Sequence, residues 1–309
     1  MPERYYSVNG FLREKFSGQK TIKIPIDAHF NCPNKDGTLS DKGCIFCDSY
    51  GSGPVQSPNI PIRQQIESFI RKHPNRKYIV YYQAHTNTYA PLAELKEKFC
   101  IVFSYEDVVG LFIGTRPDTV ADDIYPLLEK LREKTYLAIE LGLQSIHEKS
   151  LCFLNRNHTY LDFLKTFGKL KERGIDVIVH LIVGIPDETQ DDMFSTIYEM
   201  NRLKPAGIKF HLLHVLRNTP LHEQYIRKAF PLLTQEKYVE LIVSLLEKLD
   251  PSIVIHRLTG ERDREIFFAP SWALDKMRVL HAIHKKMADL NTFQGKSMSD
   301  TRVYPIPSG

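Results

Sequence analysis

The sequence has few cysteines, little net charge and no long apolar run. Its 309 residues include five cysteines, 16 glycines and 18 prolines, a composition that excludes disulfide-scaffold, collagen-like and disordered chains. No apolar run approaches the roughly 18 residues of a membrane helix, and the N-terminus has no apolar leader, so we expect a cytoplasmic protein without a membrane partner. With 41 Lys and Arg against 37 Asp and Glu, the formal charge is +4, which does not demand a nucleic-acid partner.

The apolar residues that are present follow a β/α rhythm. Short β-rich runs alternate with helical patterns, as at Ile124, Leu127, Leu128 and Leu131, which stand at i, i+3, i+4 and i+7. Most of the β-rich runs are continuously apolar, which favours parallel strands covered on both faces. The predicted strands are Ile22–Ile26, Tyr78–Tyr82, Val108–Ile113, Leu137–Leu141, Val177–Val183, Ile208–Leu213 and Ile253–Leu258.

Six or seven such units fit more than one architecture. An open doubly wound sheet and a complete or partial β/α barrel both build on this alternation, and periodicity alone does not choose between them. Trp272–Leu290 has the pattern of a final helix. The polar residues 291–309 predict a loosely attached tail.

Three cysteines lie in one long loop. The first predicted strand ends at Asp27, and Cys32, Cys44 and Cys47 follow in a stretch rich in Gly, Pro, Asn and Asp. A long loop after a parallel strand is where β/α folds place their chemistry. In a reducing compartment, clustered cysteines favour a metal or cluster site over disulfides. Two sites fit the spacing: a zinc ion with His29 as fourth ligand, or an iron–sulfur cluster with one iron left open.

The residues around these cysteines resemble a known family. The loop contains Cys-Pro-Asn-Lys-Asp-Gly-Thr at 32–38 and Gly-Cys-Ile-Phe-Cys at 43–47. This pattern resembles the radical S-adenosylmethionine (SAM) superfamily, and within it the YhcC/YtqA-like family, which is related to the catalytic subunit of Elongator. The resemblance continues through Thr115–Asp118, Glu140–Ser145 and Gly184–Thr189.

The resemblance implies an α/β fold of a particular kind. We expect the partial (β/α)6 barrel of TIM type that radical SAM proteins share, with a C-terminal helical extension. Residues 1–260 would form the barrel core with an N-terminal extension. Residues 261–309 would form the C-terminal helix and tail.

The resemblance also implies the cofactors. Cys32, Cys44 and Cys47 would hold a [4Fe-4S] cluster whose open iron binds SAM. A one-electron donor such as flavodoxin or ferredoxin would then drive reductive cleavage of SAM to a 5′-deoxyadenosyl radical, which abstracts hydrogen from the substrate.

Several further residues would bind SAM. Phe46 would lie against the adenine, and Gln144 and Arg156 would contact the ribose and carboxylate. The family's Gly-Gly-Glu motif is replaced by residues 83–87, so backbone carbonyls or the Gln83 amide would receive the amino group. His180 would point toward the ribose, and the turn at Gly184 would shape the adenine edge. The complete predicted set is Phe46, Gln83, Glu140, Gln144, Arg156, His180 and Gly184.

For the substrate, the resemblance implies the C5 side chain of the tRNA wobble uridine. The alternatives are a radical SAM enzyme for a small metabolite or peptide, and a zinc-stabilised binding protein without redox chemistry. Basic residues at 71–77 and 276–286 give RNA modest support. Polar side chains at strand ends suit an anionic, hydrogen-bonding substrate. The candidate contacts are Tyr82, His85, Asn87, Arg116, His211 and His214, with Tyr89, Arg217, His256 and Arg257 in the same pool.

Overall fold

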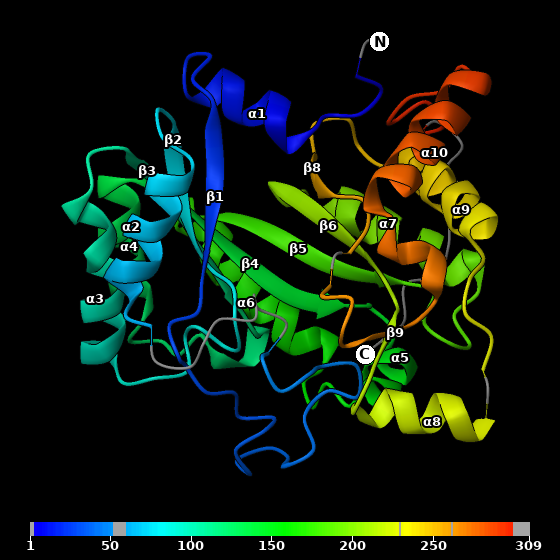
Figure 1. Cartoon of the computed structure of the whole chain (residues 1–309), viewed down its shortest axis with the longest axis horizontal. Helices are drawn as coiled ribbons and strands as arrows, with labels where there is room; N and C mark the ends of the chain where they lie inside the picture. The colour runs from blue at the N-terminus through cyan, green and yellow to red at the C-terminus, as the bar shows by residue number, and fades with distance from the viewer. Residues whose placement is uncertain (1–2, 52–59, 229, 261, 299–309) are drawn as a thin grey trace.

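A parallel sheet forms the centre of the protein. The computed structural model describes residues 3–51, 60–228, 230–260 and 262–298. Seven strands pair in the order β1-β2-β3-β4-β5-β6-β8, so each lies beside the sheet strand that precedes it in the chain. Figure 1 shows the sheet curving from β1 to β8 with helices along its outer face. The strands are β1 (Thr21–Ile26), β2 (Lys77–Tyr82), β3 (Val108–Thr115), β4 (Tyr136–Gln144), β5 (Asp176–Val183), β6 (Gly207–Leu212) and β8 (Val254–Arg257).

This arrangement confirms the predicted partial barrel, with a seventh strand beyond the expected six. The helices that continue the β/α alternation are α2 (Ile62–Lys72), α3 (Leu92–Cys100), α4 (Tyr125–Lys134), α6 (Tyr160–Glu172), α7 (Gln190–Leu203) and α9 (Gln235–Lys248). Side chains fix where some of these helices begin, because Thr159 and Asp162 form a capping box at α6 and Thr189 and Asp192 form one at α7.

Strand alternation divides the core into an outer and an inner part. In β2, Tyr78, Val80 and Tyr82 pack with the helices in the largest apolar cluster. Ile79 and Tyr81 point to the opposite face and join an inner cluster. That inner cluster includes Leu12 of α1 (Val8–Lys15), so a helix that the sequence pattern did not reveal fills the amino-terminal end of the barrel.

Other short elements complete the carboxyl-terminal half. Strands β7 (Val215–Leu216) and β9 (Phe267–Ala269) form a separate antiparallel pair, and α5 (Glu148–Phe153) and α8 (Pro220–Lys228) lie in connections. The predicted final helix is α10 (Lys276–Asp289), preceded by the 3-10 turn Ser271–Leu274. None of the described helices is long and apolar enough to cross a membrane.

The prediction of a loose tail is wrong for residues 291–298. Thr292 and Gln294 are buried, and the Gln294 side chain accepts a hydrogen bond from Tyr6 N at 2.9 Å and donates to Asp250 O at 2.8 Å. These contacts attach the segment to the N-terminal residues and to the turn before β8. The rest of the predicted tail, residues 299–309, lies outside the described residues. The division at residue 260 stays a prediction.

Candidate active site

Hydrogen bonds attach the cysteine loop, which follows β1, to the connection between β4 and α6. Asn34 is fully buried, and its amide nitrogen donates to Asn155 O at 2.7 Å and to Cys44 Sγ at 3.4 Å. The backbone of Ile45 joins the loop to Leu154, since Ile45 N donates to Leu154 O at 3.1 Å. The loop therefore packs on the connection between β4 and α6, which brings its cysteines to the carboxyl ends of the strands.

All three loop cysteines line one cavity of about 150 Å³ at this end of the barrel. Most of the predicted site residues line it as well. They are Cys32, Cys44, Phe46, Cys47, Gln83, His85, Arg116, Glu140, Gln144, Arg156, His180, His211 and His214.

Two predicted substrate contacts lie elsewhere. Tyr82 faces the outer helices because strand alternation places it opposite Tyr81, and its hydroxyl donates to Lys98 O. Asn87 is buried and donates to Gly114 O at 2.8 Å and to Ala84 O at 3.0 Å. Neither side chain lines the cavity: Tyr82 bonds to the backbone of α3, and Asn87 bonds to the backbone of β3 and of its own connection. Their contact with substrate stays a prediction.

Gly184 is also outside the residues that line the cavity. Its φ is 88°, and a Cβ there would lie 2.8 Å from Leu233 Cδ1, so the position requires glycine for backbone conformation and space. The adenine contact of Gly184 stays a prediction.

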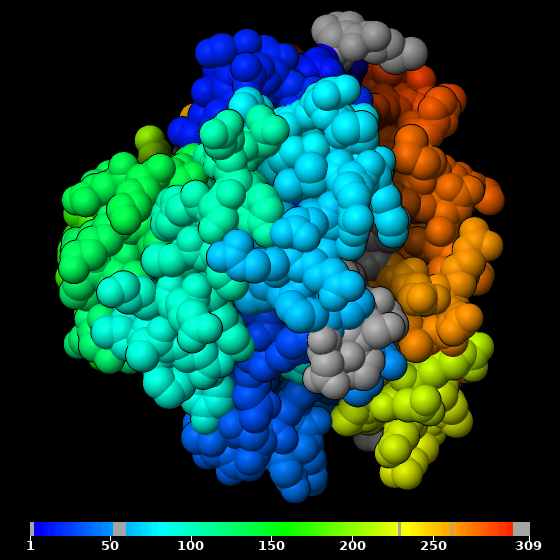
Figure 2. Space-filling model, turned by 60° about the vertical axis from the view of Figure 1, so that its left-hand side comes forward, coloured from blue at the N-terminus to red at the C-terminus, as the bar shows by residue number. Residues whose placement is uncertain are grey.

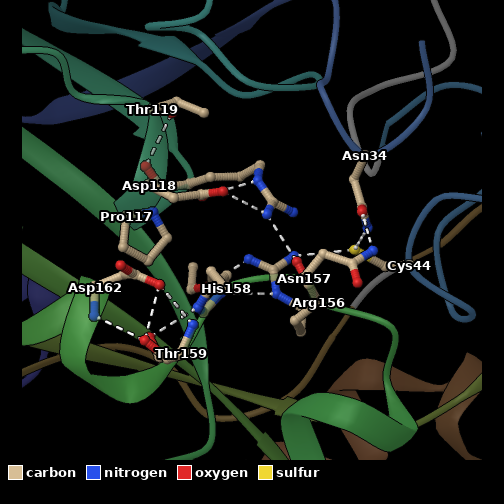
Figure 3. Close-up of polar contacts among 12 residues, drawn as sticks. Asn34, Cys44, Pro117, Asp118, Thr119, Arg156, Asn157, His158, Thr159 and Asp162 are labelled. Carbon is tan, nitrogen blue, oxygen red and sulfur yellow. Dashed lines mark hydrogen bonds and ion pairs between the residues drawn. The ribbon is translucent and has the colours of Figure 1, made fainter. Parts of the chain in front are cut away.

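Arg156 is bound to the cysteine loop. Its Nη1 donates to Cys44 Sγ at 3.1 Å, its Nη2 to Gly142 O at 2.6 Å and its Nε to His158 Nε2 at 3.1 Å. Figure 3 shows Arg156 between Cys44 and His158. The guanidinium predicted to bind SAM thus sits directly against a cysteine sulfur.

Sequence reasoning missed His158, which holds Arg156. Burial, followed by the charges of Arg156 and Arg116, lowers the pKa of His158 to about 2. A neutral imidazole explains both contacts, because Nε2 accepts from Arg156 while Nδ1–H donates to Thr159 O at 3.2 Å. The run Asn155–His158 after a buried strand was the only sequence signal for this cluster.

Two arginines set the electrostatics of the Cys44 thiol. Burial raises its pKa, but the charges of Arg156 and Arg116 outweigh burial and lower the pKa below the ordinary value. Arg116 is held by Asp118 at 2.8 Å and by Arg156 O at 2.7 Å. The thiolate, the form that binds metal, is therefore favoured at this position.

The donor set and the unsatisfied polar atoms of the cavity fit an iron–sulfur cluster with an organic partner. Three soft thiol ligands share the cavity. Three buried nitrogens of lining residues lack a hydrogen-bond partner among the described residues: His85 Nδ1, Arg116 Nη1 and His211 Nε2. Such atoms are costly unless something binds them.

The zinc alternative placed His29 beside the cysteines. His29 is not among the residues that line the cavity, and its Nδ1 lies 3.5 Å from the Asp27 carboxylate. Within the described part of the chain, no group of three His, Cys, Asp or Glu side chains is arranged to hold one ion.

Gln144 reaches the cavity through an irregularity in its strand. The register between β4 and β5 shifts between Leu141 and Gln144, and Gln144 has φ of 76°. Glycine at position 142 leaves room for the Gln144 side chain, because a Cβ at that position would lie 2.9 Å from Gln144 Nε2. Bulges of this kind commonly aim side chains into active sites.

Glu140 lies at the centre of a buried ionic network on the inner face of the sheet. The carboxylate contacts Lys23 at 3.4 Å, His180 at 2.8 Å and Lys209, with its own side chain fully buried. Burial raises the pKa of Glu140, but Lys209 and Lys23 dominate and hold it well below the usual range. The two lysines were missed because each interrupts an apolar strand pattern by a single residue.

The same network fixes the predicted SAM residue His180. Burial, followed by the charge of Lys209, lowers the pKa of His180 to about 4. Lys23 also contacts His256 Nδ1 at 3.2 Å, so side chains from β1 and β8 meet across the open side of the barrel.

The buried His214 predicts a specific pH dependence of stability. Burial, followed by the charge of Arg262, lowers its pKa to about 4, below the unfolded value of about 6.5. As pH falls below 6.5, His214 takes up a proton in the unfolded chain but not in the folded protein. Its contribution to the free energy of unfolding is therefore fully present above pH 6.5 and is lost as pH falls toward 4. The slope is about 1.4 kcal/mol per pH unit for one proton.

We expect His214→Gln to lose less unfolding free energy than the unmodified chain between pH 6.5 and 4.5, measured by urea denaturation at each pH. His281→Gln, on the exposed side of α10, is the control and should follow the unmodified chain. Equal losses in both variants would contradict a neutral, buried His214.

Comparisons with known proteins identify the family. Residues 38–198 match the model described as the Radical SAM superfamily, and residues 205–289 match the Radical_SAM C-terminal domain. Protein YtqA of Bacillus subtilis is 41% identical over 95% of this chain and 92% of its own length. A tRNA uridine(34) acetyltransferase of Methanocaldococcus jannaschii is 33% identical over 43% of this chain and 25% of its own.

A solved structure agrees in fold. The archaeal Methanocaldococcus infernus Elp3 superposes with a TM-score of 0.61 at 21% identity, over 79% of this chain and 64% of that one. A [4Fe-4S] cluster and SAM are the cofactors of the family to which these matches lead. The cysteine loop, the partial barrel and the matches agree: the chain belongs to the radical SAM superfamily and, within it, to the YhcC/YtqA-like family related to Elongator.

Proposed function

We propose that this radical SAM enzyme modifies the C5 side chain of the tRNA wobble uridine. Cys32, Cys44 and Cys47 would hold the cluster, and the remaining cavity would hold SAM and the substrate base. The observation that carries the proposal is the joint placement of three cysteines and the predicted SAM residues around one cavity. When bound, the cluster and SAM supply one-electron chemistry that removes a hydrogen atom from an unactivated carbon.

The chain's own residues prepare this cavity in three ways. Arg156 and Asn34 direct N–H groups at Cys44 Sγ, and such hydrogen bonds to sulfur tune a cluster's potential. Phe46, Ile182 and Leu213 supply apolar lining, which keeps water from a reactive site. Gln83 and Gln144 supply amide groups for the polar ends of SAM.

Support for RNA comes from the relatives. The matching tRNA uridine(34) acetyltransferase aligns over 43% of this chain and 25% of its own length. This relative is named for a uridine of tRNA, so we propose that a nucleoside of tRNA enters the cavity. Like other radical SAM enzymes, the protein needs a one-electron reductant, for which flavodoxin or ferredoxin is a candidate.

Whether the two basic runs contact RNA stays a prediction. Residues 71–77 end α2 and begin β2, and Lys77 pairs in register with Thr21 at the start of β1. Figure 2 shows the cysteine loop, in blue, at the end of the molecule opposite α1. On α10, Lys285 and Lys286 already pair with Asp289 at 2.6 Å and with Glu240 at 3.0 Å.

The RNA proposal is tested by mass spectrometry of tRNA nucleosides from a strain that lacks the gene. We expect one wobble-uridine derivative to disappear and its unmodified precursor to accumulate. Re-expression of the chain should restore the derivative, and re-expression of Cys44→Ala should not. An unchanged nucleoside profile, together with SAM cleavage in vitro, would favour the small-metabolite or peptide alternative.

A further inference from the structure

A row of nitrogen-bearing side chains crosses the inner face of three neighbouring strands. His180 of β5 pairs in register with Lys209 of β6, and Lys209 pairs with Arg257 of β8. Directly paired residues on adjacent strands project to the same face of a sheet. All three residues line the cavity, as does His211, whose ring centroid lies 5.1 Å from that of His180.

The row carries more positive charge than the fold balances. Lys209 and Lys23 share the single carboxylate of Glu140. Arg257 is half-buried, and it has no hydrogen bond or ion pair with any residue in the described ranges. Like charges at directly paired positions destabilise a sheet, so Lys209 beside Arg257 is unfavourable for the protein alone.

Burial and neighbouring positive charges both act on the pKa values of two residues in this region. Burial lowers the pKa of Lys209, and the charges of Lys23 and Arg257 lower it further. Glu140 acts in the opposite direction, but the net pKa lies well below the usual range. Burial also lowers the pKa of His211, and the charges of Arg257 and Lys209 lower it further. The buried Nε2 of His211 has no partner among the described residues.

We propose that Arg257, Lys209 and His211 bind one oxyanion group of the substrate, a carboxylate or a phosphate. An oxyanion would separate the two like charges and accept hydrogen bonds from the guanidinium fork, the ammonium group and the imidazole. The inference deepens the proposed function, because it rests on this cavity being the substrate site. It assigns an anionic substrate and places its charged end at β6 and β8.

Anion binding by the full-length, anaerobically purified chain tests this inference. Inorganic phosphate and malonate are titrated calorimetrically at constant ionic strength in chloride, with and without SAM. We expect saturable binding of at least one probe, which persists when SAM is present. Phosphate binding alone would indicate a phosphorylated substrate, and malonate binding alone would indicate a carboxylate. Absence of binding by both probes would overturn the inference.

Variants locate the site. We expect Arg257→Gln to weaken probe binding at least tenfold, and Arg257→Lys, which keeps the charge, to weaken it less. Arg13→Gln, on the exposed side of α1, is the matched control and should bind like the unmodified chain. Equal affinity in Arg257→Gln and the control would place the anion elsewhere and overturn the assignment. The readout needs no turnover, so failure of SAM cleavage would count against the proposed function and not against this site.

Discussion

We expect Cys44→Ala to abolish SAM cleavage and to remove most of the iron from the anaerobically reconstituted protein. The unmodified chain should hold about four irons, and a [4Fe-4S] cluster with only two protein thiolates is poorly retained. Cys44 is also the cysteine that Arg156 and Asn34 contact, so its loss leaves the buried guanidinium without its sulfur partner. The measurements are iron and sulfide analysis, and chromatography of 5′-deoxyadenosine after addition of SAM and dithionite.

Cys152→Ala is the matched control for this experiment. Cys152 is exposed and does not line the cavity, so its replacement should leave both iron content and SAM cleavage unchanged. Full iron content and normal cleavage in Cys44→Ala would show that the cluster uses other ligands. Loss of both properties in Cys152→Ala would mean that iron content reports general damage to the protein.

Glu140→Gln should destabilise the fold more than any surface substitution. The change keeps the shape of the side chain but removes the negative charge that, among the described residues, both Lys23 and Lys209 contact. Removing one partner of a buried ion pair costs about 3–5 kcal/mol, because the remaining charge stays buried without compensation. Urea denaturation of the purified variant measures the free energy of unfolding.

Two further variants separate charge from packing. Glu240→Gln, which removes the surface partner of Lys286, should cost no more than about 1 kcal/mol. Adding Lys209→Met to Glu140→Gln should recover part of the lost stability, since one uncompensated charge leaves the interior. If Glu140→Gln and Glu240→Gln lose equal free energy, the network does not stabilise the fold by charge pairing.

The strands were predictable because the sheet is covered on both faces. Short β-rich runs, most of them continuously apolar, identified all seven strands of the sheet, with ends that differ by a few residues. The spacing of Cys32, Cys44 and Cys47 in a long loop after a strand predicted a metal or cluster site there, and the resemblance at residues 32–47 implied which one. Strands β7 and β9 were not predicted, because they have only two and three residues. A run that short is too brief to show the alternation that identifies a strand.

The interior polar residues were harder to predict for a physical reason. Lys23 and Lys209 each stand alone in an apolar strand, and only the three-dimensional partner Glu140 explains them. Whether a strand residue such as Tyr82 or Tyr81 faces the cavity depends on register, which a continuously apolar run does not reveal. Gln294 looked like part of a polar tail, and its burial depends on backbone partners more than 40 residues away in sequence.

The strand order has a consequence for synthesis on the ribosome. Each strand of the sheet pairs with the one made just before it, so the sheet can grow at one edge as the chain emerges, with few long loops to close. The final edge is different. Ile255 N of β8 bonds to Tyr6 O at 2.8 Å, and Gln294 N bonds to Arg4 O at 2.9 Å. Arg4 and Tyr6 are therefore held by residues made much later in the chain, and until those residues emerge from the ribosome the nascent barrel exposes the backbone edge that these contacts cover.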